Sequence, residues 1–243
     1  MNRKVDHNDF KPEDVIINRD SDFAVVEAYK SIRTNIMYSI PRNEGGKTVV
    51  ITSSSAGEGK TTTCINLAIT FAQTNSRVLL IDCDLRKPKI HRYLKLEKKD
   101  GLSNVLCGFA DLDKALKIGV REHLDVLTAG DTPPNPAELL QTKEFEKLMT
   151  VFKKVYDYII IDTPPINFVT DATNAIKYSD GVILLIKKGV TTYDEVEDAL
   201  EKLEKVNSNI IGTVLIDNND GTNNKKYGYG YRYKDEPAPK RKK

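Results

Sequence analysis

The stretch that decides the fold is SSSAGEGKTTT, residues 53–63. It follows the apolar run TVVITS (48–53) and opens a stretch, 60–75, with helical spacing of apolar residues. A glycine-containing loop between a strand and a helix is the setting of a phosphate-binding loop, in which amides and the helix N-terminus surround a phosphate. The pattern G-x-x-x-x-G-K-[ST] is met except at its first position, where Ser54 replaces glycine. A turn that only caps a helix is the alternative, and the combined context weighs against it.

Further apolar runs of strand length follow the same plan along the chain. They are separated by amphipathic helical stretches that include 142–155 and 192–206. Near-continuous Val/Ile/Leu strands alternating with helices predict an α/β fold with a mostly parallel, doubly wound sheet and helices on both faces, as in P-loop NTPases. The expected strands lie within TVVITS (48–53), RVLLIDCD (77–84), LDVLTA (124–129), YDYIIIDT (156–163), GVILLIK (181–187) and IIGTVLI (210–216).

We expect three regions in this chain. Residues 1–46 form an N-terminal segment with a helix over 21–40, and residues 47–217 form the phosphate-binding core. From Asn218 the apolar pattern gives way to NNDGTNNKK and a tyrosine-rich basic sequence. Such composition cannot bury a core, so residues 218–243 are predicted to be a disordered tail.

Charge is unevenly distributed over the 243 residues. The net charge is +2, but the part from Thr222 onward holds eight Lys/Arg against two acidic residues, so it carries +6 and the rest carries −4. An acidic body argues against nucleic-acid binding, which needs a basic face. The basic tail suits an anionic lipid surface or an acidic cleft on a neighbour. Three cysteines without CxxC spacing and the lack of an apolar signal segment predict a cytoplasmic protein.

Three carboxylates stand at the ends of expected strands. LLIDCDLRKP (79–88) places Asp82 and Asp84 two residues apart, so their side chains leave one face of the strand together. IIIDTPP (159–165) places Asp162 at the end of another buried strand. The carboxyl ends of parallel strands border the crevice where open α/β sheets bind ligands. One of these acids alone could simply cap a following helix, but three beside a phosphate loop predict a site for Mg²⁺ and phosphate.

These motifs together resemble the bacterial tyrosine kinases (BY-kinases) that control capsular and exopolysaccharide synthesis. The resemblance covers nearly the whole chain and is strongest to the Gram-positive type, a kinase separate from its transmembrane activator. The related MinD/ParA ATPases share much of it. The segments that carry it are GEGKTTT, VLLIDCDLRKPKIH, GLSNVLCG (101–108), LTAGDTPPNPAELL (127–140), YDYIIIDTPP and a C-terminal tyrosine cluster.

The resemblance implies roles for individual residues. Lys60 and Thr61 would hold MgATP, Asp84 and Asp162 would hold the metal directly or through water, and Asp82 would accept the tyrosine proton. Arg86 would be either a partner of these carboxylates or a phosphate ligand. The residues implied to bind the nucleotide are Ala56, Gly57, Glu58, Gly59, Lys60, Thr61, Thr62 and Arg86.

This chain departs from its relatives at informative places. Ser55 stands where MinD/ParA proteins usually have lysine, which favours the kinase branch. The family's oligomerisation motif ExxRxxR appears as Glu27, Lys30 and Arg33, and lysine at the middle position makes a single ammonium contact instead of a bidentate one. A solvated helix face is the alternative for these three. Ile216 replaces an asparagine that relatives often carry near the nucleotide base.

The tail contains the sequence YGYGYRY (227–233). Glycine-spaced tyrosines beside a kinase-like site predict ATP-dependent autophosphorylation, in trans within a ring-like oligomer, as a protein-tyrosine kinase that regulates polysaccharide synthesis. The expected acceptors are Tyr227, Tyr229, Tyr231 and Tyr233.

The resemblance also implies partners for the chain. They are a membrane-anchored activator, which would keep the protein peripheral to the inner face of the membrane, further copies of the chain, a cognate phosphatase and other protein substrates. The rival hypotheses are an ATPase switch without kinase activity and a non-enzymatic scaffold with an aromatic tail.

Overall fold

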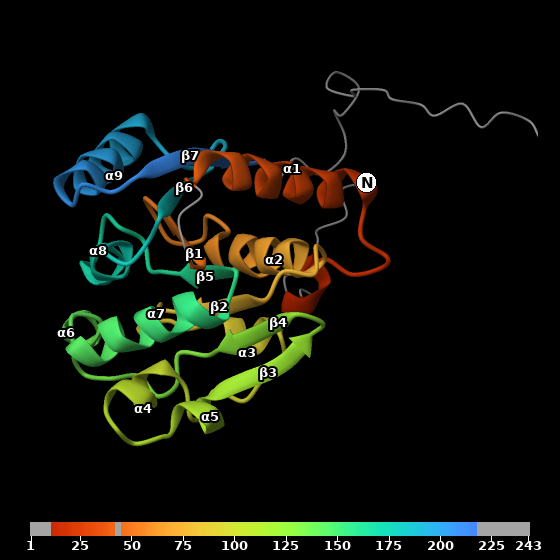
Figure 1. Cartoon of the computed structure of the whole chain (residues 1–243). Coiled ribbons are helices and arrows are strands. Elements are labelled where there is room, and N and C mark those ends of the chain that lie inside the picture. The colour runs from red at the N-terminus through yellow and green to blue at the C-terminus, as the bar shows by residue number, and fades with distance from the viewer. Residues whose placement is uncertain (1–10, 42–44, 218–243) are drawn as a thin grey trace, which may run out of the picture.

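The computed structural model describes residues 11–41 and 45–217. These residues form one seven-stranded sheet in the order β3-β4-β2-β5-β1-β6-β7 (Figure 1). All neighbouring strands run parallel except β3, which is antiparallel to β4. The strands are β1 (Lys47–Ser53), β2 (Val78–Asp82), β3 (Leu116–Arg121), β4 (Leu124–Leu127), β5 (Tyr158–Asp162), β6 (Gly181–Lys187) and β7 (Ile210–Ile216).

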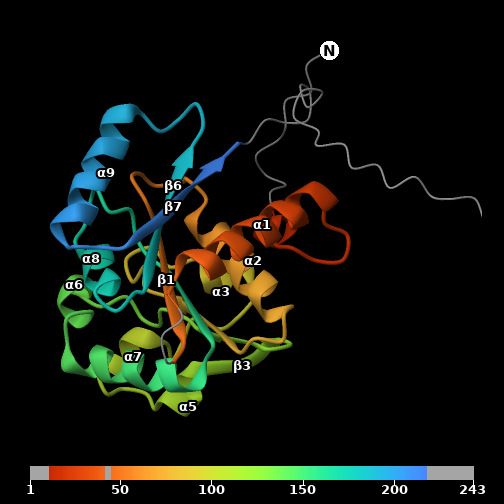
Figure 2. The same cartoon turned by 45° about the horizontal axis from the view of Figure 1, so that its top comes forward.

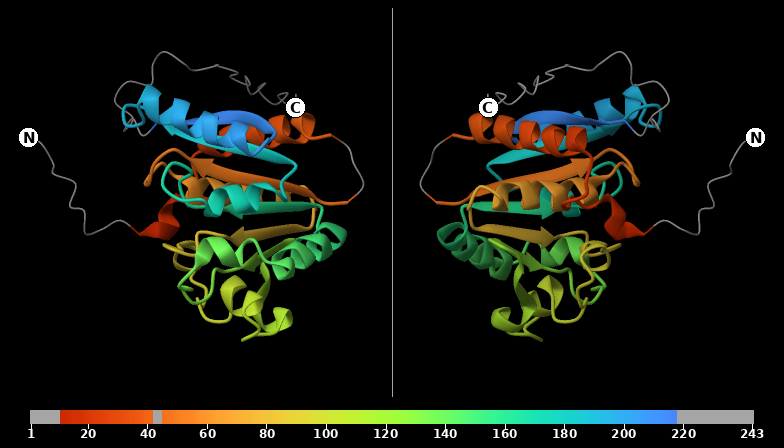
Figure 3. Two further views of the ribbon diagram at one scale, coloured as in Figure 1. Left: turned by 90° about the vertical axis from the view of Figure 1, so that its left-hand side faces the viewer. Right: turned by 90° about the vertical axis from the view of Figure 1, so that its right-hand side faces the viewer.

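Helices cover both faces of this sheet. Helices α1 and α2 lie side by side on one face (Figure 2), and most of the others lie on the opposite face. The side views of Figure 3 show the strands one above another, with β7 and β3 at opposite ends. The helices are η1 (Pro12–Val15), α1 (Phe23–Ser39), α2 (Lys60–Ala72), α3 (Ile90–Tyr93), α4 (Leu102–Leu106), α5 (Leu112–Ala115), α6 (Pro136–Leu139), α7 (Lys143–Val155), α8 (Asp171–Ile176) and α9 (Tyr193–Lys205).

The apolar strands supply two cores because successive side chains of a strand point to opposite faces. In β2, Leu79 and Ile81 pack beneath α7, whereas Val78 and Leu80 pack beneath α2. All four are fully buried. Burial on both faces is why these strands read as continuous apolar runs, and the predicted doubly wound α/β fold is confirmed.

One strand was not predicted. The edge strand β3 is partly exposed along its length and has the sequence LKIGVR, which lacks the apolar run of the central strands. It pairs with β4 through an irregular register between Lys117 and Arg121. An edge strand needs fewer buried side chains, so its sequence carries a weaker signal.

The phosphate-loop strand occupies the middle of the sheet. β1 lies between β5 and β6, and the chain crosses from β1 past β5 to reach β2. The loops that follow β1, β2, β5 and β6 therefore meet at one edge of the sheet, as expected at the switch point of such a fold. No helix in the described part of the chain is long and apolar enough to cross a membrane. The tyrosine cluster lies outside the described residues.

Candidate active site

The loop between β1 and α2 wraps around the amino group of Lys60. Gly57 and Gly59 adopt left-handed backbone angles, with φ of 81° and 90°, and Gly59 is the N-cap of α2. A side chain would strain both positions. Lys60 Nζ donates hydrogen bonds to Ser53 Oγ at 2.7 Å and to the carbonyl oxygen of Ser55 at 3.2 Å. Burial lowers the pKa of Lys60, and the charge of Asp162 opposes this effect. The lysine is thus held inside the loop, where a phosphate would arrive.

Thr61 and Asp162 join the first turn of α2 to the end of β5. The Thr61 hydroxyl donates to Asp162 Oδ2 at 2.7 Å. The other carboxylate oxygen, Oδ1, is buried and has no partner among the described residues. Burial raises the pKa of Asp162 to about 6, against the lowering effect of Thr61 and Lys60.

This arrangement fits Mg²⁺. A hydroxyl and a buried carboxylate oxygen are hard ligands, and Mg²⁺ beside a nucleotide usually takes only one or two carboxylates. Within residues 11–41 and 45–217, no group of three or more His, Cys, Asp or Glu side chains could hold a metal ion by itself.

The two aspartates after β2 differ in their surroundings. Asp82 is fully buried and accepts hydrogen bonds from the backbone amides of Asp84, Lys89 and Ile90, all at 3.2 Å. Burial, together with the charges of Asp162 and Asp84, raises the pKa of Asp82 well above its ordinary value. Asp84 lines the groove beside the phosphate loop and accepts from the amide of Lys87. The structure therefore puts Asp84 at the groove surface and Asp82 behind it.

A buried carboxylate inside the loop explains the unusual Ser54. Glu58 is fully buried, and its oxygens accept from the Ser54 hydroxyl at 3.2 Å and the Ser55 amide at 2.9 Å. Thr191, in the loop after β6, donates its hydroxyl to the same carboxylate. Ser55 is also tied to this region because its hydroxyl donates to Glu195 Oε1 at 2.7 Å. Sequence reasoning missed Thr191 and Glu195, since they lie more than 130 residues away and carry no motif.

Arg86 has a partner that the sequence did not indicate. Its guanidinium donates Nε to Asp171 Oδ2 at 2.8 Å and an NH₂ group to Asp171 Oδ1 at 3.0 Å. Asp171 begins α8, and its side chain is fully buried. Hydrogen bonding to Asp171 raises the pKa of Arg86. This geometry favours a structural role for Arg86. Its partner is a fourth carboxylate, Asp171, and not one of the three aspartates at the strand ends.

A groove of about 850 Å³ runs from the phosphate loop along α1 and the end of β7. The end of the loop and the first turn of α2, residues 56–63, line it, including the predicted nucleotide contacts from Ala56 to Thr62. An apolar wall is formed by residues 214–216, Ile32 and Tyr29. Ile216 lies close to the loop, because a Cβ placed on Gly59 would be 3.8 Å from its Cγ1. A phosphate cradle beside an apolar wall suits a nucleotide.

The three residues of the predicted oligomerisation motif make contacts within their own chain. Glu27 and Lys30 form an ion pair of 2.8 Å on α1. Arg33 turns toward α2 and donates to the carbonyl oxygen of Thr70 at 2.5 Å. Arg33 therefore links α1 to α2, whereas the ion pair of Glu27 and Lys30 lies within α1.

Comparisons with known proteins agree with this geometry. The AAA domain family model matches residues 46–216. The tyrosine-protein kinase YwqD of Bacillus subtilis is 43% identical, covering 84% of this chain and 85% of that protein. The putative tyrosine-protein kinase CapB of Staphylococcus aureus is 38% identical, covering 79% and 83%.

Solved structures lead to the same family. The chimerical protein CapA2B2 superposes with a TM-score of 0.77 at 34% identity, covering 85% of this chain and 89% of that one. The kinase domain of Escherichia coli tyrosine kinase ETK gives 0.75 at 33% identity, covering 85% and 80%. MinD of Pyrococcus horikoshii in complex with Mg-ADP gives 0.60 at 24% identity, covering 70% of each chain, a likeness of fold alone. The chain therefore belongs to the AAA domain family of nucleotide-using P-loop proteins and, within it, to the bacterial tyrosine-protein kinases.

Proposed function

We propose that this protein transfers the γ-phosphoryl group of ATP to tyrosines of its own C-terminal cluster and thereby regulates extracellular polysaccharide synthesis. The observation that carries the proposal is the pairing of Thr61 with Asp162 at the mouth of a loop that encloses Lys60. A hydroxyl, a half-free carboxylate and a lysine at one helix N-terminus are the parts that phosphoryl transfer from a nucleotide needs.

Different residues of the site would hold the metal ion and the phosphates of the nucleotide. Mg²⁺, when bound with ATP, neutralises charge on the β- and γ-phosphates. Thr61, Asp162 and Asp84 would hold the metal, directly or through water. Lys60 would exchange its contacts with Ser53 and Ser55 for phosphate oxygens, and the amides of residues 56–62 would surround the phosphate.

The chemical step needs an acceptor for the phenol proton, because tyrosine has a pKa near 10. The tyrosine oxygen attacks the γ-phosphorus, the bond from that phosphorus to the bridging oxygen breaks, and ADP leaves. The raised pKa of Asp82 suits proton acceptance. Asp82 can receive the proton only if the segment 84–90 moves, since amides of that segment cover it. Asp84 lines the groove and is the more accessible of the two carboxylates.

The proposed substrates are Tyr227, Tyr229, Tyr231 and Tyr233 of a neighbouring copy. Residues 218–243 carry a net charge of +5, and the groove is bordered by more carboxylates, Asp14, Asp20, Asp22 and Asp84 among them, than lysines. Opposite charge favours the approach of the tail to this groove. Glu27, Lys30 and Arg33 are proposed to contribute to the ring-like oligomer that brings copies together.

The proposed organisation follows from these roles. Residues 1–46 would carry the oligomerisation helix, residues 47–217 the kinase core, and residues 218–243 the substrate tail. A membrane-anchored activator would hold the kinase at the inner face of the cell membrane, and a tyrosine phosphatase would reverse the reaction. The structural relative CapA2B2 is a chimerical protein, which is consistent with a kinase that works together with a second polypeptide.

One experiment separates the kinase from its rivals. The full chain, with its membrane activator where known, is incubated with γ-labelled ATP and Mg²⁺, and products are mapped by mass spectrometry. Phosphotyrosine confined to the tail and lost in Lys60→Met supports the kinase. Phosphate release without phosphotyrosine supports an ATPase switch. The absence of both products supports a scaffold. Replacing all four tail tyrosines with phenylalanine is the matched control, because it leaves the nucleotide site intact.

A further inference from the structure

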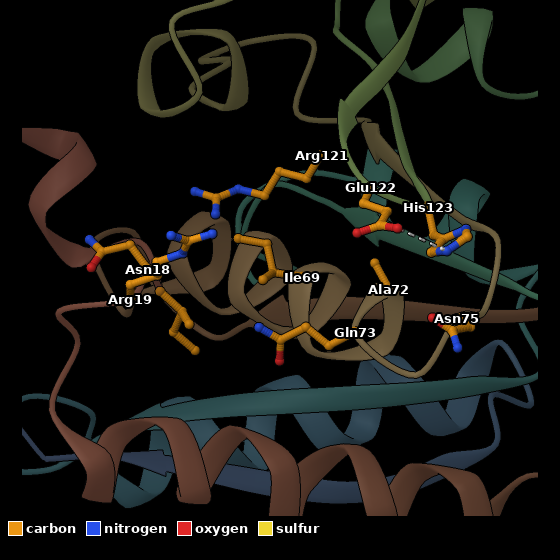
Figure 4. A pocket seen from close by; sticks show the side chains of 10 residues that line it. Asn18, Arg19, Ile69, Ala72, Gln73, Asn75, Arg121, Glu122 and His123 are labelled. Atoms are coloured by element: carbon orange, nitrogen blue, oxygen red, sulfur yellow. Dashed lines mark ion pairs between the residues drawn. The ribbon is translucent and has the colours of Figure 1, made fainter.

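A second cavity lies at the opposite end of α2 from the phosphate loop. It has a volume of about 480 Å³ and is bordered by the last turn of α2, the segment before α1 and the turn between β3 and β4 (Figure 4). Its apolar floor is formed by Ile17, Ile69 and Ala72, each less than 5% exposed. Nothing in the proposed reaction uses this cavity.

Two arginines face the cavity without a counter-ion among the residues that the structure describes. Figure 4 shows the side chains of Arg19 and Arg121 extending toward one another above the floor. Within residues 11–41 and 45–217, no group accepts a hydrogen bond from either guanidinium, and none forms an ion pair with either. The one acid in the lining, Glu122, is directed to His123, with 3.8 Å between Glu122 Oε1 and His123 Nε2. Two converging positive charges repel unless an anion lies between them.

We propose that this cavity binds a phosphotyrosine side chain of the chain's own C-terminal tail. The proposal rests on the proposed function only for the source of phosphotyrosine. An aryl ring would lie on Ile17, Ile69 and Ala72, and its phosphate would receive charge-assisted hydrogen bonds from Arg19 and Arg121. A phosphotyrosine carries about −1.5 to −2 charges at neutral pH, and the planar guanidinium group matches phosphate oxygens. The amides of Asn18 and Gln73 line the same space.

The tail is long enough to reach the cavity from its own core. Helix α2 has 13 residues, so its two ends are about 20 Å apart. Asp217, the last described residue, lines the groove at the phosphate-loop end of α2. Tyr227 is ten residues further along, a span of up to about 33 Å when extended. A second copy is therefore not required.

The tail would bind to one or the other of the two cavities according to its charge. The unmodified tail is basic and suits the acidic groove of the active site. After phosphorylation, the tail carries the aryl phosphate that the arginine cavity would hold. Capture there removes the product from the groove and leaves the nucleotide site open for another turn.

The first test uses the phosphatase-treated full chain without ATP, so it does not depend on kinase activity. Binding of a synthetic peptide of residues 223–236 phosphorylated on Tyr229 is measured by calorimetry, beside the same peptide without phosphate. We expect Arg19→Ala and Arg121→Ala each to lower the affinity for the phosphopeptide about tenfold, and Arg92→Ala, an exposed arginine on α3, to leave it unchanged. Equal binding of the two peptides, or wild-type affinity in both cavity variants, would overturn the proposal.

Competition separates the aryl group from the phosphate alone. Phenyl phosphate should displace the phosphopeptide at a lower concentration than inorganic phosphate, because its ring also covers the apolar floor. Equal potency of the two would remove the assignment to phosphotyrosine.

The source of the phosphotyrosine is tested on autophosphorylated full chain exposed to a tyrosine phosphatase. Wild-type tail should lose phosphate several-fold more slowly than the Arg19→Ala/Arg121→Ala variant. Protection that is independent of protein concentration identifies the chain's own tail, as proposed. Protection that grows with concentration assigns the site to a second copy's tail instead and overturns the intramolecular form. Equal rates in the two proteins contradict the site itself.

Discussion

The Thr61 hydroxyl donates a hydrogen bond of 2.7 Å to Asp162 Oδ2 beside the phosphate loop. The other carboxylate oxygen of Asp162 is buried without a partner among the described residues. This contact joins the first turn of α2 to the end of β5, through two residues that are 101 positions apart in the sequence. It also leaves one hard oxygen available for a cation.

Thr61→Val tests whether this hydroxyl serves the reaction. The variant keeps the shape of the side chain and removes one expected metal ligand, so we expect kcat to fall about 100-fold with little change in the free energy of unfolding. Steady-state phosphorylation assays and denaturant titration measure the two effects. Thr70→Val is the control, because the Thr70 hydroxyl donates to the Leu67 carbonyl of its own helix, away from the phosphate loop, and the substitution leaves the Thr70 carbonyl in place. Full activity in Thr61→Val would exclude the role.

Asp162→Asn tests the electrostatic cost of this buried carboxylate. Burial raises the pKa of Asp162 from 3.8 to about 6. A carboxyl group with a raised folded-state pKa stabilises the fold below the ordinary pKa and loses that contribution as pH rises through the raised value. In buffer free of Mg²⁺ and nucleotide, the variant should exceed the wild-type Tm by about 4 °C or more at pH 7.5. The difference should shrink toward pH 5, and a gap independent of pH would contradict this account.

Glu58→Gln should loosen the phosphate loop. The carboxylate of Glu58 accepts hydrogen bonds from Ser54, Ser55 and Thr191. In glutamine, an NH₂ donor would replace one of the accepting oxygens and face these donor groups. We expect ATP affinity, measured with a fluorescent nucleotide, to fall about tenfold. Glu97→Gln changes an exposed acid away from the groove and should bind as the wild type does. Unaltered affinity in Glu58→Gln would show that the network does not shape the loop.

Arg86→Ala should destabilise the fold more than loss of an ordinary surface ion pair. It leaves the fully buried carboxylate of Asp171 without its bidentate partner, at a cost of about 2 kcal/mol because Arg86 itself is 43% exposed. Denaturant unfolding measures this cost. Arg77→Ala, which breaks an exposed 3.5 Å pair with Asp157, should cost less than about 1 kcal/mol. Restoration of stability by adding Asp171→Asn to Arg86→Ala would support the pairing, and equal losses in the Arg86 and Arg77 variants would count against it.

Tail phosphorylation is expected to loosen the proposed oligomer. Each phosphate adds about −1.5 to −2 charges, so four of them change the +5 charge of residues 218–243 to a negative one. The modified tail then loses its attraction to the acidic groove of a neighbour. Light scattering before and after autophosphorylation should show a fall in mass, and an unchanged mass would refute the idea.

The fold could be predicted because its central strands are buried on both faces. Val49, Leu80 and Ile160 are fully buried and belong to continuous apolar runs, which exposed segments do not have. The glycines of the phosphate loop mark the turn into α2. The edge strand β3 escaped prediction because pairing on one side alone demands little of its side chains.

The site could be predicted only as far as its local motifs extend. Lys60, Thr61, Asp84 and Asp162 were expected near one another, and the fold brings them to the same edge of the sheet. The partners of Glu58 and Arg86 could not be foreseen, because hydrogen bonds to Thr191 and Asp171 depend on how distant loops come together. The opposite surroundings of Asp82 and Asp84 depend on the course of the segment that leads into α3.

The last strand of the sheet has a consequence for inhibitor design. Residues 214–217 border the nucleotide groove and lead directly into the tyrosine tail. A small molecule that occupies the phosphate loop and extends past Ile216 would therefore fill the groove that takes ATP and a neighbour's tail, and would also contact the residues that precede the chain's own tail. Such a compound would compete with both reactants from a single pocket, and resistance by a substitution at the end of β7 would also disturb the delivery of the tail.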